Sequence, residues 1–161
     1  MKYCTECGTK LIEKELANEG IIPYCTKCNE YRFPIYSAAI SCVIMNKTKD
    51  KILLIQQYNR KANILVAGYI NKGESCEEAL KREIKEEINC NVIDFEFNKT
   101  SYYEKSNTLM INFSVVIDEK NLKLNEEVDE AAWFTFEEAK KEIRPNSLAE
   151  HFLLNFLMKV M

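Results

Sequence analysis

The sequence contains a single histidine, no long hydrophobic run and no excess of positive charge. The histidine, His151, is predicted to be a surface or core residue and not a metal ligand. It opens the apolar C-terminal stretch 151–161, which is too short to cross a membrane and is expected to form an amphipathic helix that packs on a core. The net charge of −3 argues against a dominant surface for a nucleic-acid backbone. No secretory signal opens the chain, so a cytoplasmic location is expected.

Four of the seven cysteines form two closely spaced pairs, whereas the others are scattered. Two Cys-x-x-Cys knuckles separated by 17 residues are typical of a zinc ribbon, with four thiolates in a closed structural site. The zinc would stabilise a segment too small to build its own core. The alternative is a pair of disulfides or redox-active motifs. The predicted zinc ligands are Cys4, Cys7, Cys25 and Cys28. Of the scattered cysteines, Cys42 lies in an apolar stretch and is expected to be buried and inert.

The most informative segment is the acidic run that follows Ser75. If 75–88 is one helix, Glu83, Glu86 and Glu87 stand at i, i+3 and i+4 and share an arc of roughly a quarter of its circumference. Like charges at this spacing repel, and a hard divalent cation such as Mg²⁺ or Mn²⁺ would relieve the repulsion with oxygen ligands. The alternative is an acidic helix face that is simply solvated. The three glutamates are therefore candidate metal ligands.

This segment resembles the Nudix box. The matching residues are Gly68, Glu74, Arg82, Glu83, Ile84, Glu86 and Glu87. The box usually ends in Gly, and Asn89 stands there instead; Asn is the commonest substitute for Gly in the left-handed conformation that ends a helix. The resemblance implies a Nudix α/β/α sandwich over 35–161, preceded by the zinc ribbon over 1–34.

Hydrophobic periodicity independently favours an α/β fold with a mixed sheet and helices on both sides. We expect strands at 37–45, 51–57, 64–66, 92–98, 109–117 and 131–134, and helices at 75–88, 136–143 and 147–160. Gly68 is expected in the loop that enters the acidic helix. Thr135 and Asn146 are the candidate caps of the last two helices.

A ribbon placed before a Nudix box resembles the NADH pyrophosphatases. Three further stretches are similar to that group: 31–34, 66–69 and 145–149. The resemblance implies that Phe33 and Tyr69 stack on the nicotinamide and that the backbone near Ala149 contacts it; the alternative for the two rings is a core or rim position. The group's Pro- and Trp-rich segment after the box is replaced here by Ser101–Thr108, so the exact substrate stays open.

The function predicted from these residues is Mg²⁺-dependent cleavage of a diphosphate bond. Glu83, Glu86 and Glu87 would hold the cation, and Arg82 would pair with Glu74. NAD(H)-type dinucleotides are the first substrate class, with NAD-capped RNA as a further partner. ADP-ribose or a nucleotide sugar is the alternative within enzymes, and a non-catalytic nucleotide-sensing or nucleic-acid-binding module is the alternative outside them. The family resemblance alone implies a homodimer.

The general base is either a glutamate of the box or one from a later loop. By the resemblance Glu127, within the acidic stretch 126–130, corresponds to the later glutamate of the NADH pyrophosphatase group. The alternative is that this stretch is a solvated acidic loop.

Overall fold

Side chains alternate strictly along the two central strands of the larger sheet. The computed structural model describes residues 1–161. In β4 (Ser37–Met45), Ile40, Cys42 and Ile44 pack in one buried cluster, while Val43 and Met45 pack in another. β5 (Lys51–Gln57) repeats the pattern, so each strand contributes to a core on both faces of the sheet. These two strands have the bounds that the sequence predicts.

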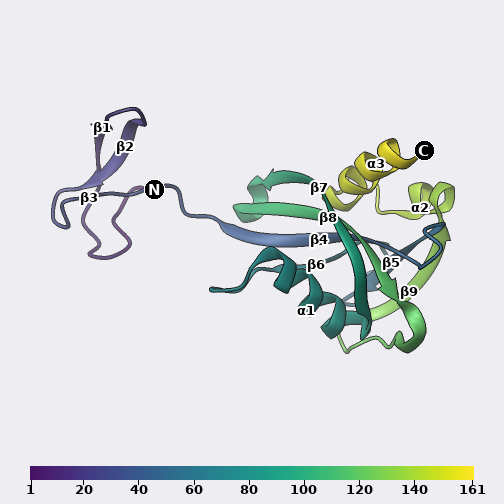
Figure 1. The fold of residues 1–161 in the computed structure, drawn as a ribbon. Helices are drawn as coiled ribbons and strands as arrows, with labels where there is room; N and C mark the ends of the chain where they lie inside the picture. Colours follow the sequence, from purple (N-terminus) through teal and green to yellow (C-terminus); the bar gives the residue numbers. More distant parts are fainter. The chain divides into compact units, whose positions relative to one another are not determined.

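The larger sheet has six strands in the order β7-β8-β4-β5-β9, with β6 also paired to β4. The remaining strands are β6 (Val66–Tyr69), β7 (Asn91–Tyr103), β8 (Thr108–Asp118) and β9 (Val128–Thr135). β4 and β8 run parallel and the other pairs run antiparallel, so the sheet is mixed, as predicted. α1 (Cys76–Ile88) covers one face, and α2 (Phe136–Glu142) with α3 (Leu148–Val160) covers the other (Figure 1). The predicted α/β/α sandwich is confirmed.

Helix α1 is fixed at both ends by the residues that the sequence indicates. The Ser75 side chain accepts from the Glu78 N–H, and the Glu78 carboxylate accepts from the Ser75 N–H, which forms a capping box. Asn89 adopts the left-handed conformation at φ 54° and ends the helix by donating its N–H to the Lys85 carbonyl. Ala79, Leu80, Ile84 and Ile88 are buried against the sheet. The acidic positions between them consequently fall on the opposite side or at the edge of this interface.

Three sequence-based strand boundaries are wrong, and one of them is the start of β9, which is Val128 and not residue 131. Gly68 lies within β6, opposite Ile40 of β4, and not in a loop, while Ile64 makes only an isolated bridge to Ile55. The predicted loop Ser101–Thr108 is mostly strand. β7 and β8 stay paired up to Tyr103 and Thr108, and a 3₁₀ turn over Glu104–Ser106 joins them. Pairing to a partner strand extends both elements beyond what their local hydrophobicity predicts.

The last helix also begins differently. Ser147, and not Asn146, caps α3 by accepting from the Glu150 N–H. Asn146 instead has a left-handed φ of 56° and donates its own N–H to the Glu150 carboxylate. Thr135 caps α2 as predicted, again with a capping box.

No helix combines the length and apolar character needed to cross a membrane.

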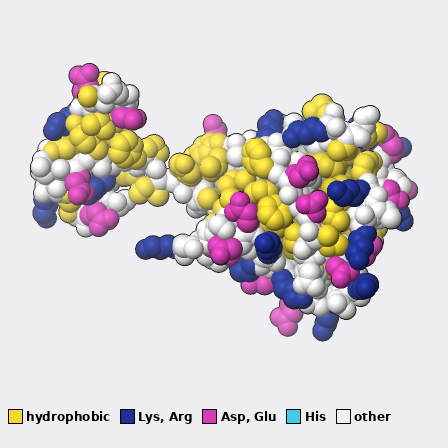
Figure 2. Space-filling model, viewed as in Figure 1, with side chains coloured by type: hydrophobic (Ala, Val, Ile, Leu, Met, Phe, Trp, Pro, Cys, Tyr) yellow, Lys and Arg dark blue, Asp and Glu magenta, His cyan; other side chains and the backbone are white.

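The structure divides into two compact units, Met1–Tyr36 and Ser37–Met161. The first is a three-stranded antiparallel sheet of β1 (Ile12–Leu16), β2 (Gly20–Cys25) and β3 (Glu30–Tyr31). On the face of the second unit seen in Figure 2, Lys and Arg are interspersed with Asp and Glu. That face carries no patch of one charge sign such as a nucleic-acid backbone would favour.

Candidate active site

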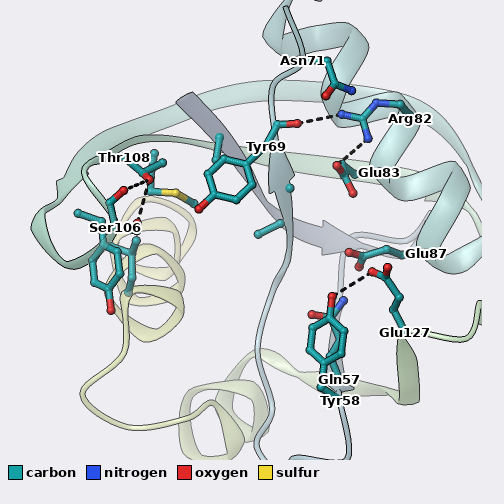
Figure 3. A pocket seen from close by; sticks show the side chains of 16 residues that line it. Gln57, Tyr58, Tyr69, Asn71, Arg82, Glu83, Glu87, Ser106, Thr108 and Glu127 are labelled. Atoms are coloured by element: carbon teal, nitrogen blue, oxygen red, sulfur yellow. Dashed lines mark hydrogen bonds and ion pairs between the residues drawn. The ribbon is translucent and has the colours of Figure 1, made fainter. Parts of the chain in front are cut away.

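One cavity of about 550 Å³ opens in the Ser37–Met161 unit beside α1 and β6. The residues that line it are Ala39, Gln57, Tyr58, Ala67, Gly68, Tyr69, Asn71, Arg82, Glu83, Glu87, Tyr103, Ser106, Thr108, Met110, Glu127 and Leu148. Figure 3 shows the carboxylates on one side, Ser106 and Thr108 on the other, and the Tyr69 ring between them. The cavity therefore has an acidic end and an uncharged end.

Glu87 is the most buried carboxylate of the acidic end, with 4% of the residue exposed. Its Oε2 atom is buried and makes no hydrogen bond within the protein. Burial, which has the largest effect, and the charges of Glu83, Glu127 and Glu86 together raise the pKa of Glu87 to about 8, although a hydrogen bond to the Gln57 side chain lowers it. A buried carboxylate with an unpartnered oxygen is costly unless a cation or a proton compensates it. The position is therefore suited to a metal ligand.

Glu83 enters the cavity directly above Gly68. A Cβ on residue 68 would lie 1.9 Å from Glu83 Oε1 and 2.0 Å from its Cδ, so any larger residue would displace the carboxylate. Burial raises the pKa of Glu83, and the Arg82 guanidinium opposes this effect. The close approach of β6 to α1 thus explains why this strand position holds glycine.

Arg82 ties the segment after β6 to the helix. Its Nε and Nη2 donate to the two Glu74 carboxylate oxygens at 2.7 and 2.9 Å, which confirms the predicted pair. Nη2 also donates to the Tyr69 carbonyl at 2.9 Å, and Nη1 donates to Glu83 at 2.7 Å and Glu86 at 3.2 Å. Hydrogen bonding to Arg82 lowers the pKa of Glu74 to about 2. All three guanidinium nitrogens are therefore occupied, and no unpaired cation faces the acidic end.

The structure brings together only part of the predicted acidic set. Glu83 and Glu87 line the cavity, whereas the Glu86 side chain is 57% exposed and contacts Arg82 at the rim. Glu127 reaches the same cavity from the segment before β9 and accepts a hydrogen bond from Tyr58. Side chains from α1, from the segment before β9 and from the turn after β5 thus meet around one space.

The uncharged end contains residues that sequence reasoning did not single out. Tyr103, Ser106, Thr108 and Met110 come from the β7–β8 hairpin, and Ser106 and Thr108 share a hydroxyl hydrogen bond of 2.8 Å. The sequence did show that Ser101–Thr108 differs from the corresponding segment of the NADH pyrophosphatases. That difference marked the region but did not show which of its side chains line the cavity. Gln57 and Tyr58, at the end of β5, belong to no motif.

Of the three predicted substrate-binding residues, only Tyr69 lines the cavity. Tyr69 is 57% exposed. Ala149 lines a neighbouring hollow that shares Ala67, Met110 and Leu148 with the cavity. Phe33 belongs to the Met1–Tyr36 unit, where it is exposed, and its role stays a prediction.

The four cysteines of the small unit form a cluster of suitable size for zinc. Their Sγ atoms all lie within 4.8 Å of one another, with Cys4–Cys28 at 3.9 Å and Cys7–Cys25 at 3.5 Å. A tetrahedral site with Zn–S bonds of about 2.3 Å places its sulfurs roughly 3.8 Å apart, whereas a disulfide needs about 2.05 Å. Arg32 donates to Cys4 Sγ at 3.3 Å and lowers the pKa of this thiol to about 6, which favours the thiolate that binds metal. The cluster fits zinc and is not disulfide-bonded.

The second unit combines an α/β/α sandwich with a cavity beside an acidic helix, and Arg82 anchors that helix. This combination defines one class of proteins. Residues 35–154 match the NUDIX domain, and the chain belongs to this family of pyrophosphohydrolases. Among curated relatives, the NAD-capped RNA hydrolase NudC of Pseudomonas aeruginosa is 22% identical over 161 residues, covering 98% of this chain and 56% of the relative. Nudix hydrolase 19, chloroplastic, of Arabidopsis thaliana is 29% identical over 154 residues, covering 88% and 34%. The chain therefore spans about half or less of the length of these relatives.

Two solved structures show the same fold. A NUDIX hydrolase from Nitrosomonas europaea has a TM-score of 0.65 at 20% identity, covering 99% of this chain and 91% of the other. The NUDIX domain of Shewanella oneidensis NrtR, solved with ADP ribose, has a TM-score of 0.65 at 15% identity, covering 86% and 94%. At these identities the likeness concerns the fold alone.

Proposed function

We propose that this chain hydrolyses the diphosphate bond of a nucleoside diphosphate joined to a second group, with divalent cations held by the acidic end of the cavity. The observation that carries the proposal is the unpartnered Oε2 atom of Glu87, buried next to Glu83 and Glu127. A diphosphate placed beside three carboxylates meets strong repulsion, and Arg82 is already occupied by protein partners. Added divalent cations would balance the charge of such a complex.

The acidic end fits Mg²⁺ or Mn²⁺, which take oxygen ligands. Glu83 and Glu87 would hold the cation from inside the cavity and Glu86 from its rim. When bound, such a cation supplies charge neutralisation and a polarised water. Arg82 keeps the glutamates in place by binding Glu74, Glu83 and Glu86 at once. The protein's own contribution is thus a pre-arranged set of carboxylates in a partly closed space.

The uncharged end supports a nucleoside as the group beside the diphosphate. Tyr69 and Tyr103 offer aromatic faces, and Ser106 and Thr108 offer hydroxyls that suit a ribose or a base edge. NudC of Pseudomonas aeruginosa is named for the hydrolysis of NAD-capped RNA. Together these features favour NAD(H)-type dinucleotides, free or as an RNA cap, with Phe33 and the Ala149 backbone as further proposed contacts.

ADP-ribose or a nucleotide sugar is the second candidate because the residues that replace the NADH pyrophosphatase segment line the cavity. Tyr103, Ser106 and Thr108 change the part of the wall that would select the second moiety. A non-catalytic sensing module is the alternative outside enzymes. The grouping of Glu83, Glu87 and Glu127 in one cavity argues against it, since binding alone has no need for three clustered acids.

The test is a product assay with Mg²⁺ and NADH, NAD, ADP-ribose, a nucleotide sugar, a diadenosine polyphosphate and NAD-capped RNA. Release of NMN identifies NAD cleavage, and release of ribose phosphate identifies ADP-ribose cleavage. Glu87→Gln should lower kcat at least about 100-fold while the melting temperature holds. Glu77→Gln, an exposed glutamate in the first turn of the same helix, is the matched control and should retain activity. Equal turnover by Glu87→Gln and the unmodified protein would overturn the assignment.

A further inference from the structure

The turn that follows β5 holds a tyrosine in a conformation that tyrosine rarely adopts. Tyr58 and Asn59 both have φ of +56°, and the Arg60 N–H donates to the Gln57 carbonyl at 3.1 Å across them. Two central residues with positive φ are typical of a primed turn, where Asn and Gly predominate. Asn59 suits the position, whereas Tyr58 is strained there. Tyr58 is 61% exposed, so burial of its ring does not explain the choice.

The contacts of this turn converge on Glu127. The Tyr58 hydroxyl donates to Glu127 Oε2 at 3.1 Å, and the Tyr58 N–H donates to the Glu127 carbonyl at 3.3 Å. The next residue continues the attachment, because the Asn59 N–H donates to the Asp129 carboxylate at 2.6 Å. On the other side, the Asn125 side chain accepts from the Glu127 N–H at 3.0 Å. Glu127 is thus held through its N–H, its carbonyl and its side chain.

Glu127 is exposed, but Tyr58 fixes the direction of its side chain, whereas a glutamate of a solvated acidic loop points freely into water. Figure 3 shows Glu127 beside Glu87, with Tyr58 joined to it from below. The Tyr58 hydroxyl donates to Oε2, so the second carboxylate oxygen of Glu127 does not take part in this bond. The strained turn therefore presents one fixed carboxylate oxygen at the acidic end of the cavity. Strain of this kind is typical of positions that the surrounding structure holds for function.

We propose that Tyr58 is a positioning residue that holds Glu127 as the general base; the proposal rests on the hydrolytic function proposed above. The oxygen of a water forms a bond to one phosphorus of the diphosphate. The bond from this phosphorus to the bridging oxygen breaks, and its electron pair leaves with the other phosphate. The proton of the water passes to the Glu127 carboxylate and then to solvent. The products are two phosphate monoesters, and Tyr58 itself exchanges no proton.

A double-mutant cycle tests this role. Tyr58→Phe keeps the ring and the turn but removes the donor, and it should lower kcat about tenfold while KM changes less than about twofold. Glu127→Gln should lower kcat about 100-fold or more. Because Tyr58 acts through Glu127, adding Tyr58→Phe to Glu127→Gln should have no further effect. Tyr3→Phe, which removes an exposed phenol from the other unit, should leave kcat unchanged.

Four results would overturn the proposal. Losses of kcat that multiply in the double mutant would show that Tyr58 acts independently of Glu127. A Tyr58→Phe variant altered only in KM, or only in melting temperature, would assign Tyr58 to substrate binding or to folding. Full turnover by Glu127→Gln, with Glu87→Gln inactive, would refute the role of Glu127 as the general base while leaving the proposed hydrolysis intact. An unmodified protein inactive on every substrate of the panel would refute both.

Discussion

Gly68→Ala is the sharpest single perturbation of the acidic end because it adds one methyl group against one carboxylate. The new Cβ would lie 1.9 Å from Glu83 Oε1, whereas ordinary van der Waals contact begins at 3.4 Å. The carboxylate must therefore retreat by about 1.5 Å. Mg²⁺ requires its ligands near 2.0–2.1 Å in close to ideal geometry, so a displacement of this size removes Glu83 from the metal.

We expect kcat of Gly68→Ala to fall about 100-fold, which corresponds to about 2.7 kcal/mol of activation free energy. The fold should be retained for two reasons. The displaced atoms are the end of a flexible side chain, and residue 68 has no positive φ that would make alanine unfavourable. Arg82 also keeps both bonds to Glu74, so the segment before α1 stays anchored. The melting temperature should be equal to that of the unmodified protein or slightly higher.

The assay combines turnover at saturating Mg²⁺, calorimetric titration with Mg²⁺ and thermal unfolding. Shortening the facing side chain supplies a second test: the double mutant Gly68→Ala with Glu83→Asp should be no slower than Glu83→Asp alone, because the clash is gone. Wild-type turnover and Mg²⁺ affinity in Gly68→Ala would show that Glu83 holds no catalytic cation, and the reasoning would fail. A large drop in melting temperature would instead show that the carboxylate cannot move aside.

Three other outcomes follow from the contacts described above. Tyr58→Asn places a residue suited to positive φ in the strained turn, so the free energy of unfolding should rise by roughly 0.5–1 kcal/mol while kcat falls. A fall in both the free energy of unfolding and kcat would contradict a strained functional turn. Cys25→Ser or chelation of zinc should expose the Met1–Tyr36 unit to limited proteolysis and leave the larger unit protected, and an unchanged digestion pattern would argue against structural zinc. The folded-state pKa of Glu74, about 2, lies below its ordinary 4.5, so its ionised form stabilises the fold above about pH 4.5 and this contribution is lost toward pH 2. The difference in melting temperature between Glu74→Gln and the unmodified protein should therefore shrink on acidification, whereas Glu77→Gln should differ little throughout.

The parts of the fold that the sequence predicts well are those fixed by local chemistry. The bounds of β4 and β5 follow from apolar runs that end at turns, and α1 is delimited by a capping serine and a left-handed Asn89. The four-cysteine cluster follows from spacing in the same way. For the strands and the helix the determining groups lie within a few residues of one another, and the cluster is recognised from two such local pairs.

The errors arise where distant segments decide the structure. Gly68 looks like a loop residue until β4 pairs with β6, and the reason for its missing side chain is Glu83, which lies on another element. The predicted strand ends at residue 98, yet pairing with β8, itself held by β4, extends β7 through Ser101–Tyr103. Tyr58 has no motif at all, since its partner Glu127 is 69 residues away in sequence. A single sequence carries no local record of such contacts.

Under the proposed function the two ends of the cavity have different roles. The acidic end determines which bond is cleaved, and the uncharged end determines which molecule is bound. Arg82 is saturated by Glu74, Glu83 and Glu86, so under the proposed function the acidic end would recognise phosphate through added cations, which bind any diphosphate in much the same way. Discrimination between second moieties must then come from the uncharged end, where the β7–β8 hairpin supplies Ser106 and Thr108. Replacing these hydroxyls should shift the ratio of kcat/KM between NAD and ADP-ribose while the dependence on Mg²⁺ stays the same. Replacing Glu87 should lower kcat/KM for NAD and for ADP-ribose by the same factor, because Glu87 acts on the diphosphate that the two molecules share.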